Sequence, residues 1–218
     1  MDDSNPKETR KNMPRGIFLL PNLFTTGALF AGFYAIIAAM NGRFEIAATA
    51  IFIAFLLDGL DGRVARLTNT QSAFGAEFDS LSDMVSFGVA PALIVYMWSL
   101  AYLRDVSNFM GKLGWLAAFI YATATALRLA RFNTQVGTAD KRYFQGLASP
   151  AAAAVVMGAV WFCEIYDIQG VDVTYGALVL TLTAGLLMVS NFSYYSFKDL
   201  DLREKVPFVA LLAAVLIF

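Results

Sequence analysis

Long apolar segments recur along the whole chain and are separated by short polar stretches. Because the hydrocarbon core of a bilayer is about 30 Å thick, a helix needs roughly 20 apolar residues to cross it. The segments that approach this length lie near residues 19–41, 44–66, 78–102, 113–133, 149–167, 173–192 and 205–218. Only 15% of the residues are charged, against roughly a quarter in soluble domains. The sequence therefore predicts an all-α, polytopic transmembrane helical bundle with about seven spans.

The two ends of the chain differ in character. Residues 1–15 are polar and mixed in charge, and we expect them to form an N-terminal tail. A single integral-membrane domain is expected over 16–218. Since the last apolar run, 205–218, stops without a polar residue after it, we expect the natural protein to continue beyond Phe218.

The basic residues predict the orientation of the chain in the membrane. With the N-terminus in the cytoplasm, thirteen of the 16 Lys and Arg fall on the inner side, and only Arg43, Arg104 and Lys112 fall outside. Cytoplasmic loops of membrane proteins carry such an excess of positive charge. We therefore expect a multi-pass protein of the cell inner (cytoplasmic) membrane.

The chain has no histidine and one cysteine, Cys163. This composition excludes imidazole acid–base catalysis, His/Cys zinc sites and a disulfide within the chain. A net charge of −1 argues against general nucleic-acid binding, which needs a basic face. Any chemistry must use carboxylates, basic side chains, hydroxyls, the backbone or bound ions.

Four carboxylates stand where the apolar pattern breaks. Asp58 and Asp61 are three residues apart near the inner end of the second segment, and Asp79 and Asp83 are four apart at the start of the third. Each pair shares one face of a helix. The polar link between the segments is short, so we expect antiparallel neighbours whose aspartates face each other. Carboxylates at membrane depth are costly and therefore indicate function.

Converging carboxylates repel one another unless positive charge compensates them. Arg63 and Arg66 could neutralise two of the four charges, and divalent ions could neutralise the set. Ligands that are all oxygen favour Mg²⁺ or Mn²⁺, and four carboxylates can hold two such ions for phosphoryl transfer. The small residues Gly62, Ala65 and Gly75 would let a ligand come close.

The spacing from Asp58 to Asp83 is D-x2-D-G-x2-A-R-x8-G-x3-D-x3-D. It resembles the signature of the CDP-alcohol phosphatidyltransferases at every fixed position. The resemblance implies that family's fold, a homodimer and two divalent ions bound by Asp58, Asp61, Asp79 and Asp83. It also implies that Asp83 is the catalytic general base. The residues that it implies as the lining of the CDP site are Asp58, Gly62, Ala65, Arg66 and Gly75.

Further stretches, 19–32 and 126–133 followed by 144–153, resemble the membrane-embedded phosphatidylserine synthases of bacteria and archaea. Ala148 is a departure, because that group would have proline there. The resemblance implies transfer of the phosphatidyl group from CDP-diacylglycerol to the hydroxyl of L-serine, with release of CMP. Another acceptor, glycerol 3-phosphate or inositol phosphate, stays open as an alternative.

Several polar residues lie on the same side of the membrane as the aspartates. Arg128 and Arg131 share a helix face and could bind the serine carboxylate or a lipid phosphate, or anchor the helix at the headgroups. Asn133 could contact serine or cap its helix. Asn22 and Thr25 could hydrogen-bond the cytidine or a neighbouring helix.

An ion-coupled transporter is the alternative from another functional class, since acids within the membrane also mark transport pathways. A transporter would place its acids along a path through the bilayer, often in two related halves. Here the acids gather at one face and no internal repeat is visible. The pattern therefore favours an enzyme.

Overall fold

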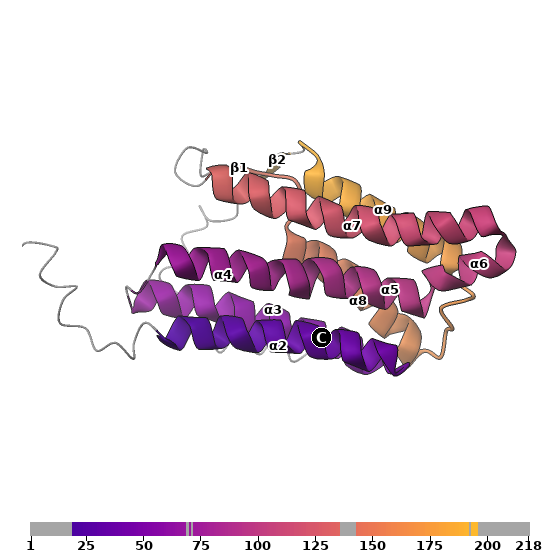
Figure 1. The fold of residues 1–218 in the computed structure, drawn as a ribbon, viewed down its shortest axis with the longest axis horizontal. Coiled ribbons are helices and arrows are strands. Elements are labelled where there is room, and N and C mark those ends of the chain that lie inside the picture. The colour runs from indigo at the N-terminus through magenta and orange to yellow at the C-terminus, as the bar shows by residue number, and fades with distance from the viewer. Residues whose placement is uncertain (1–18, 69, 71, 136–142, 192, 196–218) are drawn as a thin grey trace, which may run out of the picture.

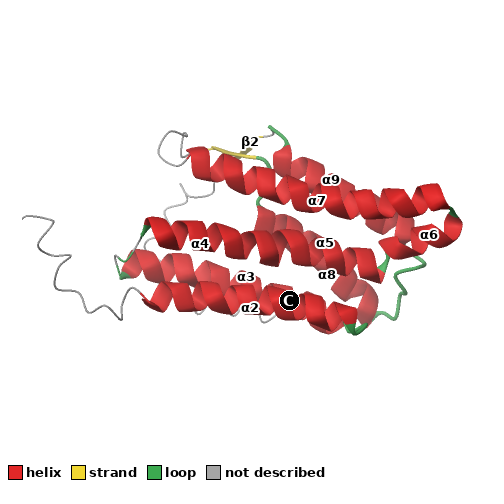
Figure 2. Ribbon diagram, viewed as in Figure 1, coloured by secondary structure: helices red, strands yellow, loops and turns green. Residues whose placement is uncertain are grey.

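The computed structural model describes residues 19–68, 70, 72–135, 143–191 and 193–195. Its longer helices run side by side along one axis, and a small two-stranded ribbon lies at one end (Figures 1 and 2). The longer helices are α2 (Leu19–Met40), α3 (Phe44–Leu67), α4 (Ala73–Asp83), α5 (Ala90–Trp98), α7 (Asn108–Gln135), α8 (Ser149–Ile165) and α9 (Thr174–Val189). The shorter elements are the π-helix η3 (Met84–Val89), the 3-10 helix η4 (Leu100–Tyr102), α6 (Leu103–Val106), β1 (Tyr143–Gln145) and β2 (Ser193–Tyr195). The predicted all-α bundle is confirmed.

Three helical stretches of the described chain are long and apolar enough to cross a membrane: Pro21–Met40, Ala73–Trp98 and Asn108–Thr134. Helices α8 and α9 are apolar but shorter. Helix α3 has 24 residues, and its charged end carries the first pair of aspartates. The tail 1–15 and the last predicted segment, 205–218, lie outside the described residues.

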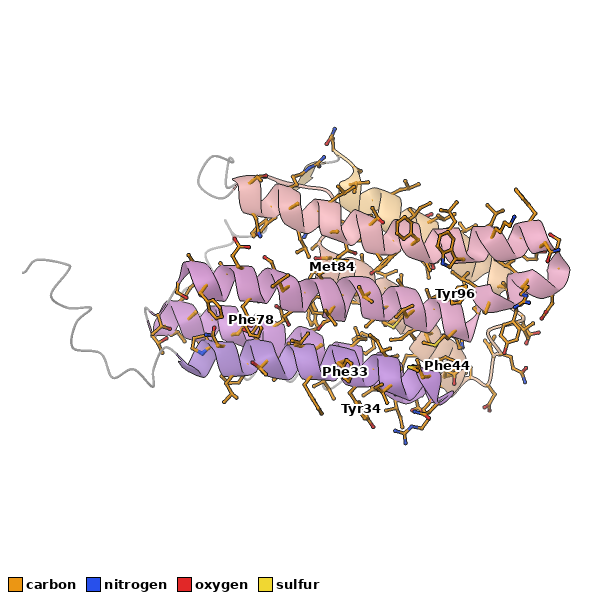
Figure 3. The ribbon with its side chains drawn as sticks, in the orientation of Figure 1. Phe33, Tyr34, Phe44, Phe78, Met84 and Tyr96 are labelled. Atoms are coloured by element: carbon orange, nitrogen blue, oxygen red, sulfur yellow. The ribbon has the colours of Figure 1, made fainter. Side chains whose placement is uncertain are left out.

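Lipid-facing side chains cover the outside of the bundle. Phe33 and Tyr34 point from α2 away from the other helices (Figure 3), and their exposed fractions are 57% and 37%. Phe30 on the same helix stacks on Tyr34. Exposed aromatic side chains on several helices are expected where lipid rather than water surrounds the protein. The fold and the family described below make this chain a membrane protein.

Helices α2 and α3 form a tight antiparallel hairpin. Gly42 makes the turn with a φ of 71°, which glycine adopts without steric cost. The residues buried along the two helices are mostly alanines, among them Ala35, Ala38, Ala47 and Ala54. Small residues allow close contact between helices in lipid, so α2 comes near enough to α3 to contact its functional residues.

The apolar stretch Ala73–Trp98 is one continuous run of α4, η3 and α5 (Figure 1). Pro91 has no N–H group to donate to the Phe87 carbonyl, which would be its helical partner. The Tyr121 hydroxyl of α7 donates to that carbonyl instead, at 3.2 Å. The N–H of Ala90 bonds to the carbonyl of Val85, five residues back, which is the π-helical pattern. The π-helix therefore begins directly after Asp83.

Helices α3 and α7 end, and α4 begins, at one end of the bundle, called here the aspartate end. The ribbon of β1 and β2 lies at this end beside α7 (Figure 1), with Tyr143 paired to Tyr195 in antiparallel register. Gly146 follows β1 with a φ of 77°, and a Cβ there would collide with the Met188 carbonyl. Only glycine fits this close approach between the chain leading into α8 and the end of α9.

Candidate active site

The structure brings the four aspartates together at the aspartate end of the bundle, between α3 and α4. One carboxylate oxygen from each of Asp58, Asp61 and Asp79 lies within 4.8 Å of the others. The carboxyl groups of Asp58 and Asp83 lie within hydrogen-bonding reach of each other, and so do those of Asp61 and Asp79. The structure therefore confirms the prediction that the Asp58–Asp61 pair faces the Asp79–Asp83 pair.

Local sequence explains why α4 starts where it does. The Ser72 side chain accepts the N–H of Gly75 at 3.0 Å, and Ser72 itself is extended. This is the usual N-cap arrangement for a serine. Helix α2 packs against both α3 and α4, and Asp79 and Asp83 lie on the face of α4 directed at Asp58 and Asp61 of α3.

The aspartates are withdrawn from solvent. Asp61 is only 5% exposed, and the other three are half-buried. Two like charges about 4 Å apart repel by about 4 kcal/mol at the effective dielectric of a protein surface. One oxygen of Asp79, Oδ1, is buried and has no hydrogen-bond partner among the residues that the structure describes. Crowded carboxylates with an unpartnered buried oxygen form a donor set that suits a divalent ion.

Thr25 and Asn22 reach the site from α2. The Thr25 hydroxyl donates to Asp61 Oδ2 at 2.6 Å, and the Thr25 carbonyl accepts from the Ser82 hydroxyl at 3.2 Å. The Asn22 side-chain oxygen lies 3.6 Å from the position that a Cβ of Gly75 would take. Asn22 and Gly75, both predicted CDP contacts, are therefore neighbours, whereas Thr25 is engaged with a carboxylate.

The other predicted CDP residues lie on the last turns of α3. Gly62 and Arg66 are exposed and Ala65 is half-buried. A Cβ built on Gly62 would have no described atom within 4 Å. This leaves open space beside the aspartates, on the side of α3 where a ligand can approach.

Arg128 and Arg131 lie near the C-terminal end of α7. Arg128 Nη1 donates to the Ser149 hydroxyl at 3.3 Å, and Arg131 Nη1 donates to the Ser190 carbonyl at 3.4 Å. The Arg128 Nε is buried and has no partner among the described residues. Asp83 lies close enough to interact electrostatically with Arg128. The geometry therefore brings Arg128 to the same site as the aspartates.

Asn133 makes a contact that neither sequence interpretation included. Its Nδ2 donates to the Ser80 hydroxyl at 3.0 Å, which joins the end of α7 to α4. The sequence analysis also missed Ser82 and Ser149. Ser80 and Ser82 flank Leu81 between the two aspartates of α4, and that position was the available signal. Nothing in the sequence marked Ser149 apart from its place at the start of an apolar segment.

Comparison with known proteins identifies the family. Residues 18–189 match the CDP-alcohol phosphatidyltransferase family, and the chain belongs to it. The resemblance based on the aspartate spacing is thereby confirmed.

Curated relatives carry a more specific name. A Helicobacter pylori protein is 39% identical over 202 residues, which cover 93% of this chain and 82% of the relative. A Methanocaldococcus jannaschii protein is 40% identical over 149 residues, covering 68% of this chain and 63% of the relative. A Saccharomyces cerevisiae protein is 38% identical over 146 residues, covering 61% of this chain and 50% of the relative. All three are named CDP-diacylglycerol–serine O-phosphatidyltransferase.

Proposed function

We propose that this protein transfers the phosphatidyl group of CDP-diacylglycerol to the hydroxyl of L-serine, giving phosphatidylserine and CMP. The observation that carries the proposal is the convergence of four aspartates at the aspartate end of the bundle. The names of the relatives support serine as the acceptor.

Two divalent ions, Mg²⁺ or Mn²⁺, complete the site, held by Asp58, Asp61, Asp79 and Asp83. The unpartnered oxygen of Asp79 supports this assignment. When bound, such ions neutralise the pyrophosphate of the substrate and stabilise the charge that develops as CMP leaves. Asn22, Gly62, Ala65, Arg66 and Gly75 line the part of the site that takes the CDP group.

Asp83 is the general base. It lies at the junction of α4 and η3, within reach of both Asp58 and Arg128. It accepts the proton of the serine hydroxyl while the serine oxygen bonds to the phosphorus that carries the lipid. The bond from that phosphorus to the CMP oxygen breaks in the same exchange. A carboxylate is the natural base in a chain without histidine.

Arg128, Arg131 and Asn133 position the anionic groups of the substrates. The fixed fork of a guanidinium suits a carboxylate or a phosphate. Arg128 has an unused donor at the site, so it is the better placed of the two arginines. Arg131 and Asn133 contact Ser190 and Ser80 respectively, which holds the end of α7 against its neighbours.

The site opens to the cytoplasm from the cell inner membrane, with the N-terminus on the same side. The distribution of Lys and Arg supports this orientation. One integral-membrane domain, 16–218, carries the whole site, and the protein works as a homodimer.

A CMP-release assay tests the proposed acceptor. Purified full-length protein receives CDP-diacylglycerol and Mn²⁺ or Mg²⁺ with serine, glycerol 3-phosphate or inositol phosphate. We expect CMP with serine. If CMP is released only with glycerol 3-phosphate or inositol phosphate, that compound and not serine is the acceptor. If a folded protein releases no CMP with any acceptor, the proposed transferase activity is refuted. Substitutions of Asp79 or Asp83 in this assay are compared with Glu77→Gln, because Glu77 is an exposed acid on the same helix.

A further inference from the structure

Thr25 occupies a junction of three helices at the aspartate site. It lies on α2, and its carbonyl accepts from Ser82 on α4. Its hydroxyl lies 3.2 Å from the Pro21 carbonyl of its own helix and donates to the nearer acceptor, Asp61 Oδ2 on α3. Thr25, Asp61 and Ser82 are 4%, 5% and 2% exposed. The contact with Asp61, at 2.6 Å, has the length of a charge-assisted bond from a hydroxyl to a carboxylate.

A buried carboxylate on a helix can rotate about its side-chain bonds unless a partner holds it. Thr25 holds Oδ2 of Asp61, and the Asp61 carboxyl group also lies within hydrogen-bonding reach of the Gly62 N–H and of the Asp79 carboxyl. Asp61 also has the smallest solvent-exposed fraction of the four aspartates. Partners of this kind fix the orientation of metal ligands and strengthen metal binding.

We infer that Thr25 is a positioning residue for the metal site, because its hydroxyl holds Asp61 in the orientation that binds a divalent ion. This inference rests on the metal binding proposed above. Of the two roles that the sequence left open for Thr25, it assigns the hydrogen bond to a neighbouring helix in place of the cytidine contact. Ser82 supports the same arrangement by fixing the Thr25 backbone against the helix that carries Asp79 and Asp83.

The neighbouring residue provides a matched control. Thr26 lies next to Thr25 on α2, but its hydroxyl donates to the Asn22 carbonyl of its own helix at 2.7 Å, and it is exposed. Replacing either threonine by valine removes one hydroxyl and keeps the shape of the side chain. Only Thr25→Val removes a hydrogen bond to an aspartate of the site.

The experiment measures Mn²⁺ affinity of the purified full-length protein, without lipid substrate or serine, from the electron paramagnetic resonance signal of free Mn²⁺. We expect Thr25→Val to weaken Mn²⁺ binding by about 10- to 100-fold, the usual effect of removing such a partner. Thr26→Val should bind Mn²⁺ as the wild type does, and Thr25→Ser, which keeps the hydroxyl, should restore most of the affinity.

Two results would overturn the inference. One is wild-type Mn²⁺ affinity in folded Thr25→Val, and the other is an equal loss in Thr25→Val and Thr26→Val. If Thr25→Val does not fold, Thr25→Ala is judged by the same criteria, since it removes the hydroxyl without adding a methyl group in its place.

A double-mutant cycle tests whether Thr25 acts through Asp61. In an Asp61→Asn background, Thr25→Val should cause no further loss of Mn²⁺ affinity, and a full additional loss would contradict the inference. These measurements do not involve serine, so they can fail while CMP release with serine succeeds. If the wild type binds no Mn²⁺, the metal site itself is refuted, whereas the choice of acceptor is decided by CMP release alone.

Discussion

Gly32 on α2 sets the distance between α2 and the π-helix that follows Asp83. A Cβ at Gly32 would lie 2.8 Å from Ser86 Cα, a backbone atom. Ordinary contact begins at 3.4 Å, so Gly32→Ala must separate the two helices by about 0.6 Å or more. Ser86 lies three residues after Asp83, and its hydroxyl donates to the Ala28 carbonyl at 3.1 Å. Moving the π-helix away from α2 will therefore also shift Asp83, the proposed general base.

A misplacement of about 1 Å at a reacting group can lower a rate about 100-fold. We expect Gly32→Ala to lower kcat for CMP release by about 10- to 100-fold, since its displacement is somewhat smaller than 1 Å. Alanine is the better helix former by about 1 kcal/mol, so a weaker helix cannot explain the loss.

The control is Gly27→Ala on the same helix. Its Cβ would meet only the tip of the Leu57 side chain, at 3.3 Å, and that flexible tip can move aside. We expect activity within about threefold of the wild type, as for a substitution away from sensitive contacts. Both variants are compared by initial rates of CMP release after size-exclusion chromatography and a thermal unfolding scan confirm folding. Wild-type kcat in folded Gly32→Ala, or an equal loss in both variants, would refute the reasoning.

Three further predictions concern the site itself. Asp83→Asn should lower kcat by about 10²- to 10⁴-fold, the usual contribution of a general base, while CMP binding measured by calorimetry stays close to wild type; unchanged turnover would remove Asp83 as the base. Chelation of divalent ions should abolish CMP release, and added Mn²⁺ or Mg²⁺ should restore it; full activity after exhaustive chelation would contradict the metal assignment. Ser149→Ala should raise the KM of serine or of CDP-diacylglycerol by about tenfold, because a hydrogen bond to the charged Arg128 is worth about 1.5 kcal/mol or more. Thr181→Ala removes an equally buried hydroxyl that is bonded within its own helix, and it should leave both KM values unchanged. Equal effects of the two variants would contradict the role of Ser149.

The convergence of the aspartates could be predicted from the sequence because it depends on local spacing. Offsets of three and four residues place Asp58 with Asp61, and Asp79 with Asp83, on single helix faces. The short link then makes α4 run antiparallel to α3. Helix α2 packs against both helices and joins them at Thr25, which the local spacing does not predict.

Helix boundaries were predicted less well where polar residues begin a helix. The predicted segment 78–102 starts in the structure at Ala73, because Ser72 caps the first turn of α4. The predicted segment 113–133 starts at Asn108, where the N–H of Met110 bonds to the Ser107 hydroxyl. A search for apolar residues passes over such capped polar turns, since the cap and not hydrophobicity starts the helix.

The remaining features of the site depend on tertiary contacts that spacing does not encode. In the π-helix after Asp83, the Phe87 carbonyl accepts from the Tyr121 hydroxyl of another helix. The ribbon of β1 and β2 joins residues about 50 positions apart in the chain. The partners of Arg128 and Thr25 come from separate helices in the same way, and only the packed bundle shows them.

The central claim is that the aspartate site joins the serine hydroxyl to the phosphatidyl group. It is tested most directly with L-serine carrying ¹⁸O in its hydroxyl, incubated with CDP-diacylglycerol, Mn²⁺ and the full-length protein, with mass spectrometry of both products. We predict phosphatidylserine that retains the ¹⁸O and CMP that contains none. Label in CMP, phosphatidylserine without label, or no phosphatidylserine from folded protein would contradict the claim.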